Sequence, residues 1–462
     1  MFSKNLYVSR RKKLAAKIRS GIILIPGNTE AAMNYPANTY HFRQDSNFLY
    51  FFGLDQPDLI GIIDADNHKE YIFGNDTDIE DIIWMGPQPT MKELASEVGV
   101  EHTSPLDKVA ELLAAGIKSG RKIHFLPTYR GEQVIQLHRL LGLIHSRVND
   151  YASMELIRAV VDLRSVKDRY EVAEIEKAVD IAYDMFTTGM KMAHPGVYER
   201  EIVGVMEGIS VAGGNPVSFP VILSINGQTL HNHKHGNKLV ANRMLVMDAG
   251  SESQMHYASD ITRTVPVGGK FSPKQKEIYQ IVLEANLKSI DAIQPGVSYK
   301  SIHLLAARTI AHGLKELGLM KGNVEEAVAA GAHALFFPHG LGHMLGLDVH
   351  DMEGLGENNV GYDHTVVRSD QFGLAYLRMA KTLVPGYVLT VEPGIYFIPE
   401  LIEQWKVEKK FPGFINYEKI AGYMEIGGVR IEDDVLVTPE GHKVLGMPIP
   451  KTVQEIETTV RG

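Results

Sequence analysis

The chain has 462 residues, of which 44% are apolar and 22% are charged, an ordinary globular composition that is sufficient for a large core. The formal net charge of −9 argues against a nucleic-acid partner, because proteins that bind nucleic acid usually carry a basic face. The chain contains no cysteine, which excludes disulfides, thiolate metal sites and a cysteine nucleophile.

No stretch approaches the roughly 18–20 consecutive apolar residues that a membrane helix requires. The apolar run at residues 22–26 is also shorter than the ~7–15 residues of a signal-peptide core. We therefore expect a cytoplasmic protein with no membrane partner.

Short apolar and amphipathic segments alternate from residue 1 to residue 160. A helix is predicted at 9–18, followed by buried strands at 21–26, 59–65 and 122–127 and by helices at 91–97 and 106–115. This alternation predicts an α/β domain, residues 1–160, with a partly parallel sheet.

A helix with apolar residues at three- and four-residue spacing follows, including Ile175, Val179, Ala182 and Phe186. Beyond it, strands are predicted at 243–247, 387–391 and 428–438, with long helices at about 273–292 and 301–317. Strands and helices that occur in groups favour an α+β domain, and we assign it residues 161–462.

Acidic residues and histidines gather in four short segments of the second domain. These segments are Asp248-Ala-Gly with Ser259-Asp260-Ile-Thr-Arg-Thr, His339-Gly-Leu-Gly-His343 with His350, Thr-Val-Glu392-Pro-Gly, and Val-Arg430-Ile-Glu432-Asp-Asp.

Each segment alone also fits a structural role, since Asp, Gly and Pro are common in turns and paired histidines often lie on exposed helices. Two details weaken that interpretation. The glycines between His339 and His343 disfavour a helix by about 1 kcal/mol each relative to alanine. Asp248, Glu392 and Glu432 follow or interrupt apolar runs, where a carboxylate is costly unless its charge is compensated.

Charge balance predicts what compensates these acids. Asp248, Asp260, Glu392 and Glu432 would repel one another if they were crowded together, and two divalent cations would balance their four charges. With His343 added, the donor set suits Mn²⁺ and also accepts Co²⁺, Fe²⁺ or Zn²⁺.

The ordered motifs around these five residues resemble those of the pita-bread metallopeptidases, which include methionine aminopeptidase, aminopeptidase P and prolidase. His41-Phe-Arg-Gln-Asp-Ser-Asn-Phe and Trp84-Met-Gly extend the resemblance to the N-terminal domain of aminopeptidase P and the longer prolidases. Methionine aminopeptidases lack that domain. The resemblance covers the whole chain and implies an α/β N-terminal domain followed by an α+β pita-bread catalytic domain.

The same resemblance implies hydrolysis of Xaa-Pro bonds in small proline-containing peptides, by a hydroxide that bridges two metal ions. It assigns Asp260 and Glu432 to both ions, Asp248 to one, and His343 with Glu392 to the other. Glu392 is also the implied general base.

Other residues are assigned to the substrate by resemblance. His231 and His350 would stabilise the oxyanion and protonate the leaving nitrogen, while His339 and Arg430 would lie near the proline. Trp84 would reach the active site of a partner subunit, which implies a homodimer or a homotetramer.

The stretch around Phe372 to Arg378 and the insert after Tyr396 resemble the longer prolidases, in which a matching arginine faces the carboxylate of a dipeptide. A guanidinium can bind a carboxylate through two hydrogen bonds. Prolidase activity is therefore favoured, with aminopeptidase P activity on longer peptides as the alternative.

One motif departs from the family pattern. Asn232 replaces the tyrosine that usually follows the histidine matched by His231, and the nearby His233 and His235 leave the register open. Metal-free creatinase-like enzymes and inactive peptide-binding relatives share this fold, but both typically lack metal ligands that this chain retains.

Overall fold

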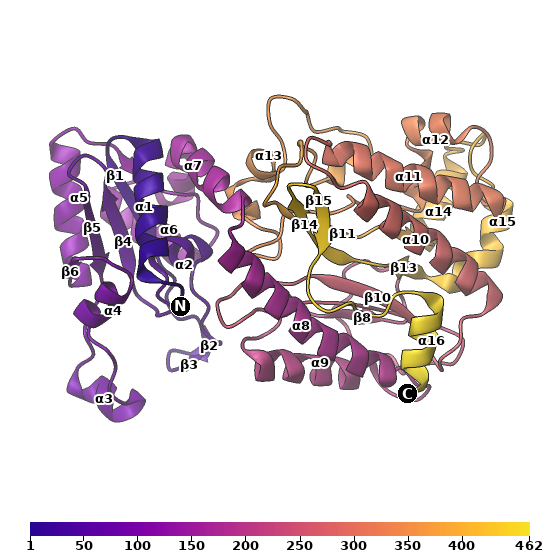
Figure 1. Ribbon diagram of the computed structural model, residues 1–462, viewed down its shortest axis with the longest axis horizontal. Coiled ribbons are helices and arrows are strands. Elements are labelled where there is room, and N and C mark those ends of the chain that lie inside the picture. The colour runs from indigo at the N-terminus through magenta and orange to yellow at the C-terminus, as the bar shows by residue number, and fades with distance from the viewer. The chain divides into compact units, whose positions relative to one another are not determined.

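The computed structural model describes residues 1–462, which form two compact units (Figure 1). The first unit contains Met1–Arg164 and the short segment Glu353–Asn359, and the second contains Ser165–Met352 and Val360–Gly462. The chain therefore returns to the first unit once, from the middle of the second. No helix combines the length and the apolar character needed to cross a membrane.

The first unit is built on a five-stranded sheet with the order β6-β5-β4-β1-β7. The pairs β1–β7 and β5–β6 are parallel and the other two pairs are antiparallel, so the predicted partly parallel sheet is confirmed. Its strands are β1 (Ile22–Pro26), β4 (Ile60–Asp64), β5 (Lys69–Phe73), β6 (His102–Ser104) and β7 (Ile123–His124), and β2 (Ala32–Tyr35) with β3 (Asn38–Thr39) forms a separate hairpin.

Seven helices accompany this sheet: α1 (Lys4–Ile18), α2 (Ser46–Phe52), α3 (Ile79–Met85), α4 (Met91–Glu97), α5 (Val109–Lys118), α6 (Gly131–Leu141) and α7 (Met154–Ser165). The core between sheet and helices contains Leu24, Ile62, Phe73 and Leu113, which are fully or almost fully buried. The first helix starts earlier than the predicted residue 9, because Tyr7 already packs into the interior.

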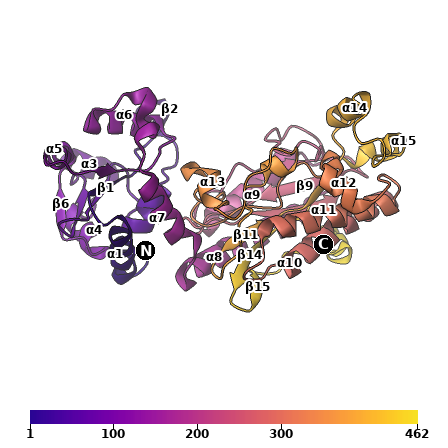
Figure 2. The same cartoon turned by 90° about the horizontal axis from the view of Figure 1, so that it is seen from above.

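Four long helices enclose the second unit, and they are α8 (Arg169–Lys191), α9 (Glu199–Gly213), α10 (Pro273–Asp291) and α11 (Tyr299–Glu316). The short helix α16 (Val453–Arg461) lies at the C-terminus. The pairs α8–α9 and α10–α11 pack together, and Figure 2 shows the second pair side by side. Ser272 caps α10 by accepting the amide of Gln275, with Pro273 in the first turn, as the sequence predicted.

The strands of this unit lie between the two helix pairs in Figure 1. One antiparallel sheet has the order β10-β9-β8, another has the order β11-β14-β15, and β12 pairs with β13. The strands are β8 (Ile222–Ser224), β9 (Met244–Ala249), β10 (Ile261–Pro266), β11 (Val388–Val391), β12 (Gly394–Tyr396), β13 (Gly428–Arg430), β14 (Asp433–Thr438) and β15 (Gly441–Val444).

Smaller helices complete the second unit: α12 (Val324–Ala330), α13 (Glu357–Val360, which begins in the segment assigned to the first unit), α14 (Pro399–Val407) and α15 (Tyr417–Ile420). The predicted strand at 428–438 proves to be two strands. The chain leaves β13 after Arg430, and the amide of Glu432 then bonds to the carbonyl of Thr262 at 3.0 Å before β14 begins. This break turns Glu432 toward β10 and is the main local difference from the sequence prediction.

Candidate metal centre

A cavity of about 650 Å³ opens in the second unit. Its wall includes every site residue that the sequence predicted except Trp84, and those residues are His231, Asp248, Asp260, His339, His343, His350, Arg378, Glu392, Arg430 and Glu432. Trp84 instead lies on α3 of the first unit, where it is 80% exposed.

The acidic residues of this cavity come from four separate segments, each at or near the end of a strand. Asp248 is on β9, where it pairs with Ile222 of β8 and with Thr262 of β10. Asp260 immediately precedes β10, Glu392 follows β11, and Glu432 lies in the break between β13 and β14. Residues that are far apart in sequence therefore converge because neighbouring strands end, or are interrupted, at the same place.

Burial and mutual repulsion raise the pKa values of three of these carboxyl groups. Burial first, and then the neighbouring Asp248, raises the pKa of Asp260 well above the usual range for an aspartate. Burial, Asp260 and Glu392 raise the pKa of Glu432 in the same way, and burial raises the pKa of Glu392 to about 8. A cation at this site would favour the ionised form of all three groups.

His343 presents one ring nitrogen to these acids. Its Nδ1 lies 3.0 Å from the carbonyl oxygen of Met344, which can only accept, so Nδ1 carries the hydrogen of the neutral ring. Its Nε2 lies 3.3 Å from Asp260 Oδ2 and 3.6 Å from Glu392 Oε1. This tautomer directs the lone pair of Nε2 toward the carboxylates, as a metal ligand requires.

The donor atoms fit a divalent cation. Ligand atoms of Asp260, His343 and Glu432 all lie within 4.8 Å of one another, and all three residues are buried. Oδ1 of Asp248 is also buried and accepts no hydrogen bond, although a buried carboxylate oxygen normally has a partner. Four carboxylates and one imidazole form an oxygen-rich site of the kind that Mn²⁺ prefers.

Arg430 fixes the geometry on one side of the cavity. Its Nε donates to Thr262 Oγ1 at 3.1 Å, its Nη1 donates to the Tyr396 hydroxyl at 2.7 Å, and its Nη2 donates to Asp248 Oδ2. Thr262 Oγ1 in turn donates to Glu432 Oε2 at 2.6 Å. Thr262 is therefore a partner of a candidate ligand carboxylate.

Tyr396 is a site residue to which the sequence reasoning assigned no role. Its hydroxyl accepts from Arg430 and lies 2.9 Å from His339 Nε2, so it joins a partly buried imidazole to a buried guanidinium. Burial first, with Arg430 contributing, lowers the pKa of His339 to about 3 and keeps that ring neutral. The available signal was the tyrosine that ends the Thr-Val-Glu-Pro-Gly-Ile-Tyr motif.

Three further histidines line the cavity, whereas His235 bonds to the backbone of β8. The ring of His350 lies 4.1 Å from the ring of His343, centroid to centroid. His231 and His233 line the cavity, whereas His235 lies 3.1 Å from the carbonyl oxygen of Leu223 through Nδ1.

Asn232, which departs from the family motif, has a local structural role. Its Nδ2 donates to Ser224 Oγ at 3.1 Å, and its Oδ1 accepts the amide of Lys234 at 3.0 Å. These bonds hold the loop that carries the cavity histidines against the end of β8.

Gly342 allows the close approach that positions His343. A Cβ atom built at Gly342 would lie 2.1 Å from the carbonyl oxygen of Thr390. At the same contact, the amide of His343 donates to Thr390 Oγ1, and the amide of Thr390 donates to the carbonyl oxygen of His343. We expect Gly342→Ala to destabilise the protein by about 1–3 kcal/mol through overpacking against backbone. The measurement is the thermal unfolding midpoint, which should fall by several degrees.

Gly413→Ala is the matched control, because an added Cβ at that exposed turn meets no atom within 4 Å. Its unfolding midpoint should stay near the wild-type value. Equal midpoints for Gly342→Ala and wild type would show that the loop can move away from Thr390 at little cost.

Family models match most of the chain. The model described as metallopeptidase family M24 matches residues 173–439, and the model described as the aminopeptidase P N-terminal domain matches residues 7–124.

Two named relatives cover the chain almost completely. A probable Xaa-Pro aminopeptidase, pepP, of Aspergillus fumigatus is 34% identical over 428 residues, which are 90% of this chain and 87% of that protein. The Xaa-Pro dipeptidase of Homo sapiens is 32% identical over 477 residues, covering 99% and 93%.

Solved structures of similar proteins agree with the fold. Aminopeptidase PepP of Pseudomonas aeruginosa superposes with a TM-score of 0.82 at 28% identity, and covers 99% of this chain and 98% of that one. A Glu383Ala variant of Escherichia coli aminopeptidase P in complex with substrate gives 0.81 at 27% identity, with the same coverage. The predicted pita-bread fold and family resemblance are confirmed, and the chain belongs to metallopeptidase family M24, with an aminopeptidase P N-terminal domain ahead of the M24 domain.

Proposed function

We propose that the protein is a dinuclear metallopeptidase that hydrolyses the Xaa-Pro peptide bond, preferentially in Xaa-Pro dipeptides. The observation that carries the proposal is the convergence of four carboxylates, three of them buried and that of Glu392 partly exposed, with the Nε2 face of His343 in one cavity. The names of the relatives, which include both Xaa-Pro aminopeptidase and Xaa-Pro dipeptidase, support the reaction type.

The five donors would hold two divalent ions, with Mn²⁺ preferred and Co²⁺, Fe²⁺ or Zn²⁺ as alternatives. Asp260 and Glu432 would serve both ions, Asp248 one of them, and His343 with Glu392 the other. When bound, the ions supply a water of lowered pKa as nucleophile and polarise the scissile carbonyl. The inactive and metal-free relatives of this fold typically lack ligands, whereas all five are present here.

The chain's own groups handle protons and orient the substrate. Glu392, which lines the cavity, would accept the proton released during attack as general base. His350 and His231 donate to the developing oxyanion and to the leaving proline nitrogen. His339, held neutral by burial, and Arg430 form the wall against which the proline ring packs.

The preference for proline has a physical basis. The nitrogen of the scissile bond carries no hydrogen, so the site need not offer an acceptor there. Arg378 lines the cavity and would bind the free carboxylate of a dipeptide, while it would disfavour a longer peptide that presents an amide at that point.

Aminopeptidase P activity on longer peptides is the second candidate. It is favoured by the names of the fungal relatives and of the solved structures that superpose over nearly the whole chain. The two candidates share the metal centre and differ in what faces the carboxyl side of the proline, so Arg378 discriminates between them.

The first prediction of this proposal concerns the metal. Chelation should abolish hydrolysis of an Xaa-Pro dipeptide, and Mn²⁺ or Co²⁺ should restore it. Asp260→Ala and Glu432→Ala should each lower activity by more than about 100-fold, since loss of groups that merely support ligands already costs ~10–100-fold. Glu440→Ala, in an exposed turn, is the control and should match wild type. Full activity in metal-free Asp260→Ala protein would exclude a two-metal mechanism.

The second prediction concerns substrate length. Arg378→Ala should raise KM for an Xaa-Pro dipeptide and lower kcat/KM about tenfold or more, because a charge-assisted contact is worth ~1.5–3 kcal/mol. Cleavage of an Xaa-Pro-Yaa tripeptide should fall less or rise. Arg378→Lys should recover only part of the loss, since lysine lacks the planar fork.

Arg308→Ala is the control for this substitution, because Arg308 lies on α11 and its nearest charged partner is the exposed Glu325, 3.7 Å away. Both substrates should be cleaved at wild-type rates by this variant. A wild-type preference for tripeptides, with both substrates affected equally by Arg378→Ala, would identify the enzyme as an aminopeptidase P.

The third prediction concerns assembly. Ile79, Ile83, Trp84 and Met85 are each about 70–80% exposed on the short helix α3, an unusual density of large apolar side chains for a free surface. We expect a homodimer or homotetramer in which Trp84 reaches a partner subunit's active site. Light scattering should give a multiple of the chain mass, and Trp84→Ala should lower activity without changing metal content. A fully active monomer would contradict this arrangement.

A further inference from the structure

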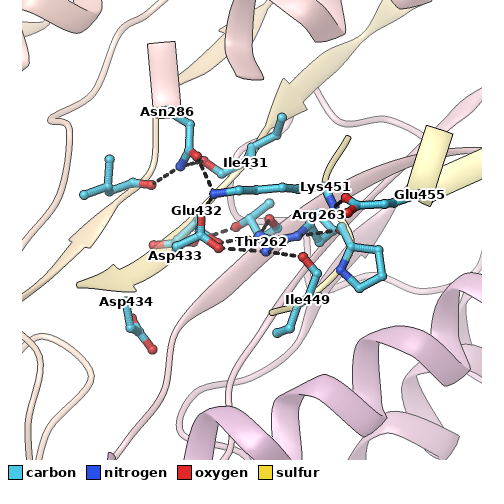
Figure 3. A network of polar contacts seen from close by, with 12 residues as sticks. Thr262, Arg263, Asn286, Ile431, Glu432, Asp433, Asp434, Ile449, Lys451 and Glu455 are labelled. Atoms are coloured by element: carbon cyan, nitrogen blue, oxygen red, sulfur yellow. Dashed lines mark hydrogen bonds and ion pairs between the residues drawn. The ribbon is translucent and has the colours of Figure 1, made fainter. Parts of the chain in front are cut away.

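A buried polar network lies behind the carboxylates of the metal centre (Figure 3). Arg263 is its most connected member and is almost completely buried. Its Nη1 donates to the carbonyl oxygen of Glu432 at 2.6 Å, and its Nη2 donates to Asp433 Oδ1 at 2.7 Å and to the carbonyl oxygen of Ile449 at 3.0 Å. The network therefore joins the segment that carries Glu432 to the chain just before the C-terminal helix α16.

Lys451 completes the network from that C-terminal segment. Its Nζ donates to Asp433 Oδ2 at 2.7 Å and to Asn286 Oδ1 at 3.0 Å. Its main chain is held as well, because its carbonyl oxygen accepts from the Tyr279 hydroxyl at 2.6 Å and its amide donates to Glu455 Oε2 at 3.1 Å. The ammonium group is therefore presented from a fixed backbone, as Figure 3 shows.

Asn286 bonds to both of the backbone segments that carry the glutamates of the site. From the buried face of α10, its Nδ2 donates to the carbonyl oxygen of Val391 at 3.0 Å and to that of Ile431 at 3.4 Å. These two residues immediately precede Glu392 and Glu432. One side-chain amide thus sets the spacing between the backbones on which both candidate ligands stand.

Lys451 anchors the oxygen end of that amide. A carboxamide has one accepting oxygen and one donating nitrogen, and the two carbonyl oxygens, which can only accept, take the nitrogen end. The ammonium bonds to the remaining Oδ1 and, through Asp433, ties the carboxamide to the segment that follows Glu432. Without the ammonium, the carboxamide would be held only by the two backbones that it joins, and those backbones could shift together with it.

We propose that Lys451 is a positioning residue of the metal centre: by anchoring Asn286 and pairing with Asp433, it fixes the relative placement of Glu392 and Glu432. The inference rests on the proposed metallopeptidase function. Lys451 contacts neither the cavity nor a candidate ligand side chain, so its effect must pass through the two backbones.

The test uses the full-length protein and Lys451→Met, which keeps an unbranched side chain but removes the ammonium. Titration of the metal-free protein with Mn²⁺ should give a dissociation constant raised by about 10-fold or more, in line with other residues that support metal ligands. On an Xaa-Pro dipeptide, kcat should fall while KM stays near wild type. Asn286→Leu should act in the same direction, and the double variant should be little worse than either single one.

Lys443→Met is the matched control, since Lys443 pairs with Glu176 in an exposed contact of similar length, 2.6 Å. It should leave Mn²⁺ affinity unchanged. A second readout needs no metal: in the metal-free protein, Lys451→Met should speed amide hydrogen exchange at β11 and at residues 431–434, and Lys443→Met should not.

Either of two outcomes would overturn the inference. The first is wild-type Mn²⁺ affinity in Lys451→Met, whether or not its unfolding midpoint is lowered. The second is unchanged hydrogen exchange in that variant at both backbone segments. If wild-type protein itself bound no Mn²⁺, the metallopeptidase proposal would fail, and hydrogen exchange would still decide whether Lys451 fixes the two strands.

Discussion

Four carboxylates converge in one cavity, and their mutual repulsion is the constraint on which the rest of the second unit depends. Burial and the neighbouring acids raise the pKa values of Asp260, Glu392 and Glu432, so bringing these groups together costs free energy that a cation can offset. The guanidinium of Arg430 reaches into the group and donates to Asp248. The fold thus retains an excess of negative charge at a point where divalent cations can offset it.

The antiparallel strands make this concentration of charge possible. Each acid stands at a strand end or at a strand interruption, where a side chain can leave the regular alternation without disturbing a whole sheet. Backbone bridges pair Thr262 of β10 with Glu432, and Leu389 of β11 with Met344. Behind the first of these bridges, the buried Arg263 donates to the carbonyl oxygens of Thr262 and Glu432.

The sequence was most informative where chemistry demands a fixed residue type at a fixed spacing. The acids, the cavity histidines and Arg378 could be found because Asp, Glu, His and Gly occur there in short motifs whose order matches a known family. The long helices α10 and α11 were predictable from their periodicity and from the cap at Ser272. The break after Arg430 was not, because it is imposed by a bond to another sheet and leaves no local pattern.

Supporting residues were harder to find for the same reason. Lys451 and Asn286 stand 165 positions apart in sequence, and neither belongs to a motif of the site. A lone lysine before a helix, or an asparagine within one, is ordinary in any soluble protein, and only the three-dimensional fold brings their polar groups together. Trp84 is the opposite case. Its sequence motif was recognisable, but its side chain is exposed to solvent and the structure of one chain shows no site around it.

The short segment Glu353–Asn359, which belongs to the first unit although it lies deep within the sequence of the second, has a consequence for biogenesis. When the ribosome has completed residue 164, the first unit still lacks a piece that will not be made until nearly two hundred more residues have been added. The first unit therefore receives its last segment only after a large part of the second has been made. A protease that cut only between residues 164 and 165 would also leave the first unit in two covalently separate pieces.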